Sequence, residues 1–138
     1  MNVDSLLLDV NPRRVAFQGT TELSWGEVIH GVPMLVLDTG CTMAVLAPAK
    51  DIDSRTFPGD YWVEVFKVVG GVDTSASVFK ATLRIGKHEH PVEVWVVEGQ
   101  DDWLLGLPVL CKYNLILRND DARGPRLETG PNAPPVTP

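Results

Sequence analysis

The chain has 138 residues, of which 44% are hydrophobic and 22% charged, a size and content that fit one domain with a hydrophobic core. Its net charge of −6 and the lack of a basic patch argue against a nucleic-acid partner. No apolar run is long enough to span a membrane and no secretory signal is visible, so we expect an intracellular protein that does not bind membranes.

Strand-forming residues dominate the chain from end to end, and helical periodicity is nearly absent. Only Pro108–Lys112 fits a turn or two of helix, with a proline in the first helical position. We interpret His30-Gly31 as a tight turn, so that residues 27–37 form a hairpin that ends at Asp38. In chain order the predicted strands are 5–10, 15–17, 27–29, 34–37, 45–46, 61–69, 74–79, 81–85, 92–97, 103–106 and 115–117.

The apolar run Met34–Leu37 ends in Asp38-Thr39-Gly40. A carboxylate at the end of a buried strand is costly unless it is paired or used, which favours a functional acid. Thr39 supplies a hydroxyl, and Gly40 lets a second backbone or a ligand come close. All three are also common turn residues, so the tripeptide alone fits a plain strand end equally well.

A long predicted hairpin follows, with strands over 61–69 and 74–79 and the pair Gly70-Gly71 at its tip. It is either an ordinary exposed hairpin or a flap that folds over a ligand. A weak internal repeat is also present, because the pattern of Val28–Leu37 recurs at Leu83–Val97 and is followed by Trp103–Gly106. Duplication of one β motif explains it, and so does chance.

Other candidate sites are weaker. His88-Glu89-His90 has no third ligand for a metal, so we interpret it as polar turn residues and expect no metal. Cys41 and Cys111 make no disulfide framework and are expected to be reduced. The four tryptophans are most simply core or interface residues: Trp25, Trp62, Trp95 and Trp103.

Together, the Asp38 motif, the double-glycine hairpin, Leu104-Leu105-Gly106 and the short helix resemble the retropepsin family. These are the single-domain aspartic proteases of retroviruses, retrotransposons and related cellular proteins. The resemblance covers roughly Val28–Arg118, and Leu115–Leu117 is similar to the C-terminal strand that joins an intersubunit sheet in the family.

Two positions depart from the family pattern. Cys41 stands where alanine or serine is common after the Asp-Thr-Gly motif, and a thiol is small and apolar enough to fit there. Leu107 and Pro108 stand where many members carry arginine and then aspartate or asparagine, which brace the dimer. The second departure puts the strength of the dimer in doubt.

The resemblance implies an all-β fold: a closed or partly open barrel of the retropepsin type with one short C-terminal helix, assembled as a symmetric homodimer. The expected organisation is an N-terminal segment over 1–14 that supplies an interface strand, a retropepsin-like domain over 15–118, and a disordered tail rich in proline and glycine over 119–138.

It also implies an aspartic endopeptidase in which Asp38 from each of two copies activates a water against a peptide or polyprotein substrate. Asp73-Thr74-Ser75 is the nearest second copy of the motif, but it lacks the glycine and lies at the hairpin tip. Thr39 would brace the pair and Gly40 would admit the substrate backbone, with no cofactor. The flap would consist of Val69, Gly70, Gly71 and Val72, and the second motif of Leu104, Leu105 and Gly106.

Two alternatives remain open. The same fold without activity would be a dimerisation or peptide-binding module, which the absent arginine brace favours slightly. The second alternative is an unrelated small β-barrel that carries the motif by chance.

Overall fold

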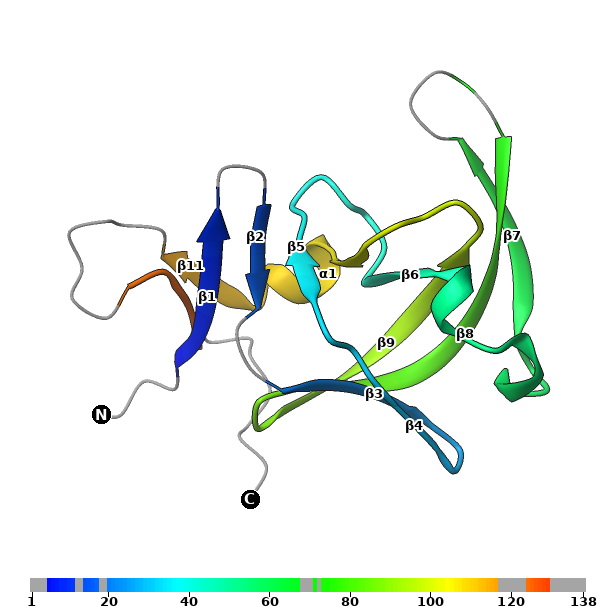
Figure 1. Cartoon of the computed structure of the whole chain (residues 1–138), viewed down its shortest axis with the longest axis horizontal. Coiled ribbons are helices and arrows are strands. Elements are labelled where there is room, and N and C mark those ends of the chain that lie inside the picture. Colours follow the sequence, from blue (N-terminus) through cyan, green and yellow to red (C-terminus); the bar gives the residue numbers. More distant parts are fainter. Residues whose placement is uncertain are drawn as a thin grey trace.

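The computed structural model describes residues 5–11, 14–17, 20–67, 71, 73–116 and 124–129. These residues form one curled sheet of 12 strands, in the order β11-β12-β1-β2-β5-β10-β6-β9-β8-β3-β4, with β7 paired to β8 (Figure 1). The strands are β1 (Ser5–Asn11), β2 (Arg14–Phe17), β3 (Thr21–Trp25), β4 (Val28–Gly31), β5 (Leu35–Leu37), β6 (Val45–Pro48), β7 (Trp62–Lys67), β8 (Asp73–Ile85), β9 (His88–Val97), β10 (Trp103–Leu105), β11 (Tyr113–Ile116) and β12 (Arg126–Thr129). Helix α1 (Leu107–Leu110) and the single 3-10 turns η1 (Ala49–Asp51) and η2 (Ser54–Thr56) complete the described chain.

The long hairpin of β8 and β9 forms the central part of the barrel. Residues on β9 alternate between buried and exposed up to Val94, which is the pattern of a strand with one face on a core. The inward side chains include Phe79, Leu83 and Val94, which are fully buried. The main core also includes residues from both ends of the described chain, among them Leu6 of β1 and Leu127 of β12. The prediction of a mostly β, partly open barrel with one short helix is therefore confirmed.

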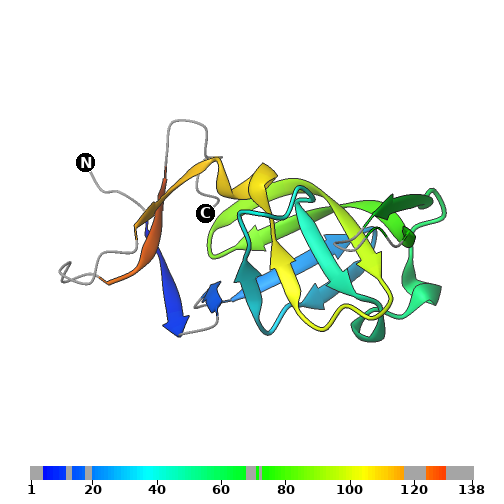
Figure 2. The ribbon, with the colours of Figure 1, turned by 90° about the horizontal axis from the view of Figure 1, so that it is seen from above.

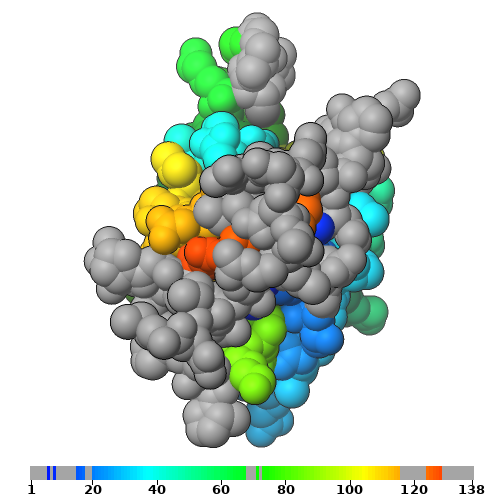
Figure 3. Space-filling model, turned by 90° about the vertical axis from the view of Figure 1, so that its left-hand side faces the viewer, coloured from blue at the N-terminus to red at the C-terminus, as the bar shows by residue number. Residues whose placement is uncertain are grey.

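Strands β11, β12, β1 and β2 form one end of the sheet, which we call the terminal sheet (Figure 2, left). Strand β12 lies between β1 and β11, with Leu127 opposite both Leu6 and Leu115. Figure 3 views this side of the molecule, where the orange atoms of β12 lie beside the yellow and light-orange atoms of α1 and β11.

The internal repeat is visible as an arrangement of strands. The hairpin β3–β4 is followed by β5, just as the hairpin β8–β9 is followed by β10, and β5 and β10 pair in parallel. Both hairpins turn at a glycine with positive φ, Gly26 at 56° and Gly86 at 58°. The repeat begins at β3, earlier than the sequence pattern indicates.

The predicted hairpin over 27–37 is wrong. His30 and Gly31 belong to β4, which pairs with β3 through the turn at Gly26, while β5 pairs with β2 and β10. The sequence prediction missed β3, whose Thr21, Leu23 and Trp25 face inward in a segment of mixed polarity.

The interpretation of His88-Glu89-His90 as polar turn residues is also wrong. The turn lies at Gly86-Lys87, and both histidines are fully buried on β9 while Glu89 points outward. The tail differs from its prediction at 126–129, which form β12, because Leu127 fits into the main core. Among the described residues, no helix combines the length and the apolar character needed to cross a membrane.

Candidate active site

Asp38 follows directly after β5, in a turn that is fixed by backbone hydrogen bonds. Its N–H donates to the carbonyl of Leu105 on β10 at 2.9 Å, and its own carbonyl accepts from the N–H of Cys41 at 3.1 Å. Because β5 and β10 are parallel neighbours, Leu104 and Leu105 lie beside the strand that carries the acid. The structure therefore brings together two of the motifs that the sequence singled out.

The carboxylate of Asp38 is partly exposed and is oriented by Gly40. The Gly40 N–H donates to Asp38 Oδ1 at 2.9 Å. A Cβ atom at position 40 would lie 3.2 Å from the same oxygen, so a side chain there would crowd the carboxylate. Gly40 is itself exposed, which leaves the carboxylate approachable from its side of the turn.

Gly106 locks the second motif onto this turn. Its N–H donates to the carbonyl of Ala44, and the N–H of Leu107 donates to the carbonyl of Cys41, both at 2.9 Å. A Cβ atom at position 106 would lie 1.8 Å from the Met43 carbonyl oxygen, which is much too close for two non-bonded atoms. Only glycine fits, and the sequence signal for this close approach was the glycine that ends the apolar segment.

The hairpin of β7 and β8 projects from the barrel (Figure 1, upper right), and its base shares an apolar cluster with the Asp38 turn. Cys41 belongs to this second cluster together with Ala76 and Val78 of β8. On β7, Phe66 packs edge-on against Trp95 with ring centroids 5.9 Å apart. At the tip, Gly71 has φ of 80°, whereas Val69, Gly70 and Val72 of the predicted flap lie outside the described residues.

The Cys41 thiol is not arranged as a nucleophile. Burial raises the pKa of this thiol, and the neighbouring Asp38 carboxylate acts in the same direction, against a lowering contribution from the backbone of Met43. A thiol with a raised pKa stays protonated and weakly reactive. Cys41 therefore acts as a small apolar residue of this turn.

Asp38 has no acidic partner in the turn. The near-copy residue Asp73 lies at the far end of the hairpin from the barrel, where its carboxylate is 3.9 Å from the ammonium group of Lys67. Thr39 is exposed, and its hydroxyl makes no hydrogen bond to any residue that the structure describes. Within one chain the site thus offers one oriented carboxylate beside an exposed hydroxyl.

No group of three or more potential metal ligands occurs in the described parts of the chain. No family model matches the chain, and no curated protein matches it.

Proposed function

We propose that the protein is an aspartic endopeptidase of the retropepsin type, active as a symmetric homodimer. The observation that carries this proposal is the Asp38 turn, in which one partly exposed carboxylate is oriented by Gly40 and locked by Gly106. The hydrogen bond from the Gly40 N–H to Asp38 Oδ1 is that of an ordinary Asx turn, and what favours a functional acid is that the carboxylate stays partly exposed at the end of a buried strand. The projecting hairpin, which shares an apolar cluster with Cys41, supplies a cover for the same region.

Carboxylate-catalysed peptide hydrolysis requires two acids that share one proton. The ionised carboxylate takes a proton from water as the water attacks the peptide carbonyl, and the protonated one donates a hydrogen bond to the carbonyl oxygen. A second copy related by a two-fold axis supplies the second Asp38 directly. The exposed Thr39 hydroxyl is then available to hydrogen-bond across the axis, and the hairpin to bind the substrate as an added strand.

The first test is the substitution Asp38→Asn, assayed on a denatured protein substrate. We expect cleavage to fall by about a thousandfold or more, because an amide can neither take up nor share the proton. Asp60→Asn, the same change at an exposed loop residue, is the matched control and should leave the rate unaltered. Cleavage by Asp38→Asn at the wild-type rate would overturn the mechanism.

Mixing the wild-type protein with Asp38→Asn tests the shared dyad. If each site takes one carboxylate from each copy, activity at constant total protein falls with the square of the wild-type fraction. A site contained in one chain gives a linear decrease instead. Sedimentation of both proteins should show dimers; dimers without any cleavage would favour the non-catalytic dimerisation or peptide-binding module.

A further inference from the structure

The projecting hairpin has one face toward the Asp38 turn and one face away from it. Directly opposite residues of an antiparallel pair share a face, and side chains alternate along each strand. Glu64 of β7 lies opposite Ala76 of β8. Ala76 is buried in the second cluster together with Cys41, which belongs to the Asp38 turn. Glu64 therefore lies on the face of the hairpin that is directed toward this turn.

Two aromatic rings flank Glu64 on this face. Trp62 and Phe66 stand two residues before and two residues after it, so all three side chains point to the same side of β7. Both rings are partly buried because they pack against the second cluster, and Phe66 also meets Trp95 edge-on. Glu64 itself is exposed. The arrangement is a solvent-accessible carboxylate between two anchored rings.

The Glu64 carboxylate is oriented by one of these rings. Trp62 Nε1 donates to Glu64 Oε1 at 3.0 Å. An indole has only this one donor, so the bond holds the carboxylate beside the ring while Oε2 remains available to another donor. No other residue in the described ranges donates to Glu64. The hairpin thus presents an unused anionic acceptor on the side of the candidate active site.

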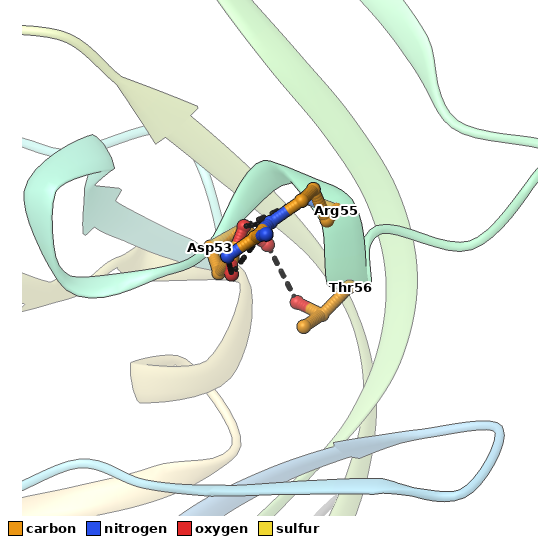
Figure 4. Close-up of polar contacts among 3 residues, drawn as sticks. All are labelled: Asp53, Arg55 and Thr56. Carbon is orange, nitrogen blue, oxygen red and sulfur yellow. Dashed lines mark hydrogen bonds and ion pairs between the residues drawn. The ribbon is translucent and has the colours of Figure 1, made fainter.

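The two basic residues closest in the chain to this carboxylate are engaged elsewhere. The Asp53 carboxylate accepts from the N–H of Arg55 at 2.9 Å and pairs with the Arg55 guanidinium at 2.8 Å. The Thr56 hydroxyl closes the same turn by donating to the Asp53 carbonyl at 2.7 Å (Figure 4). Lys67 lies on the opposite side of β7, with its ammonium group 3.9 Å from the Asp73 carboxylate. Within the described residues the carboxylate between the two rings makes no ion pair.

The rest of this face brings no excess of positive charge among the described residues. Lys80 and Glu93 stand directly opposite each other on β8 and β9, and Arg84 pairs with Glu89 at 3.7 Å. Asp38 is a further carboxylate of the region, and the whole chain carries a net charge of −6. Charge complementarity on this face therefore favours a cationic ligand.

We propose that Trp62, Glu64 and Phe66 form a subsite for a basic side chain of the bound peptide, which we call the basic subsite. This inference rests on the proposed function and names its substrate class, which is polypeptide segments that carry arginine or lysine. Arginine fits best, because a planar guanidinium stacks on an aromatic ring while its N–H groups bind a carboxylate. A peptide bound as an added strand beside the hairpin directs every second side chain to this face.

The first measurement is peptide binding to the Asp38→Asn protein, in which no probe is cleaved. The probes are two octapeptides of valine and threonine with one central residue that differs: arginine in the first, and in the second citrulline, which has the same shape without the charge. The indole N–H signal of Trp62 in a proton–nitrogen NMR spectrum reports on the carboxylate to which it donates.

We expect the arginine peptide to shift this signal and to bind about fivefold more tightly than the citrulline peptide, as for one exposed charge pair with an aromatic contact. Equal affinity for the two peptides, or no shift with either, would overturn the basic subsite.

Glu64→Gln should remove the difference between the two peptides, because the amide keeps the shape of the side chain and an oxygen for the Trp62 N–H but has no charge. Glu98→Gln is the matched control. Glu98 is equally exposed, but it lines a pocket with Val63 and Ser77 on the other face of the hairpin, so this variant should keep the preference for arginine. An equal loss of the preference in both variants would assign it to the overall charge and contradict the subsite.

Reversal of the charge gives a gain of binding that a damaged hairpin cannot produce. Glu64→Lys should bind a third octapeptide, with a central glutamate, more tightly than the arginine peptide. A continued preference of this variant for arginine would contradict the basic subsite.

Cleavage assays on the wild-type protein separate this inference from the proposed function. The arginine peptide should have a kcat/KM about fivefold above that of the citrulline peptide. If neither peptide nor any denatured protein is cleaved while the preference in binding persists, the protease is wrong and the subsite holds. If both peptides are cleaved equally well, the protease holds and the subsite is wrong.

Discussion

Gly106 is the residue on which the geometry around Asp38 depends most directly. Its absent side chain allows the backbone of β10 and α1 to meet the backbone of residues 41–44. Asp38 receives its position through the same contact, since the Leu105 carbonyl accepts the Asp38 N–H. At this scale the position of one carboxylate depends on the absence of a side chain at a residue far away in the sequence.

Gly106→Ala is expected to destabilise the fold by about 3 kcal/mol or more, because the new methyl group meets rigid backbone and not a side chain that can move. Chemical denaturation measures this effect. Gly31→Ala is the matched control, since a Cβ there meets nothing within 4 Å, and its cost should stay within about 0.5 kcal/mol. Equal stability of the two variants would contradict the close contact at Gly106.

At the scale of elements, β12 shows how a short strand is specified by its place. Residues 126–129 stand in a segment rich in proline, glycine and charge, where composition indicates disorder. The strand forms because β1 and β11 leave a position between them, and because Leu127 is fully buried there in the main core. Arg126 is also buried, and its guanidinium pairs with Glu128 at 2.7 Å.

Leu127→Ala should therefore lower the free energy of unfolding by about 2–5 kcal/mol, as expected for a cavity in a core. Leu115→Ala provides the comparison, since Leu115 lies opposite Leu127 on β11 but is 41% exposed and should lose less than about 1 kcal/mol. Urea denaturation of both variants gives the two values. A Leu127→Ala protein as stable as the wild type would show that β12 adds nothing to the folded unit.

At the scale of the whole molecule, the barrel and the terminal sheet meet at a buried histidine. His90 Nε2 of β9 lies 2.5 Å from the hydroxyl of Tyr113 on β11. Its Nδ1 is buried without a hydrogen-bond partner among the described residues. Burial lowers the pKa of His90 to about 4, with contributions in the same direction from Lys112 and His88. The contact between the two parts of the molecule is therefore built for the neutral ring.

This arrangement predicts a loss of stability in acid. Between pH 6.5, the ordinary histidine value, and about 4, the unfolded chain binds a proton at His90 that the folded chain does not bind. The free energy of unfolding should fall through this window by up to about 3 kcal/mol and be fully present above it. Denaturation curves at a series of pH values measure the profile, and His90→Gln should flatten it. An unchanged profile in that variant would place the acid sensitivity elsewhere.

Much of the local structure follows from the sequence alone. Alternation along residues 81–85 predicts a strand, residues 92–97 predict a further one, and the apolar run before Asp38 predicts an acid presented at a strand end. Leu104-Leu105-Gly106 was singled out by its resemblance to the second motif of the retropepsin family. These features depend on neighbours in the chain, and the sequence contains them directly.

The pairing of distant segments was decided by the tertiary structure. Nothing local distinguishes a strand that pairs with β3 from one that pairs with β10, so the partner of the strand before Asp38 was predicted wrongly. His88 and His90 look like polar turn residues until Tyr113 covers them, and Leu127 gives no periodic signal of its own. Burial of these residues depends on contacts across the fold, which only the closed barrel and its terminal sheet provide.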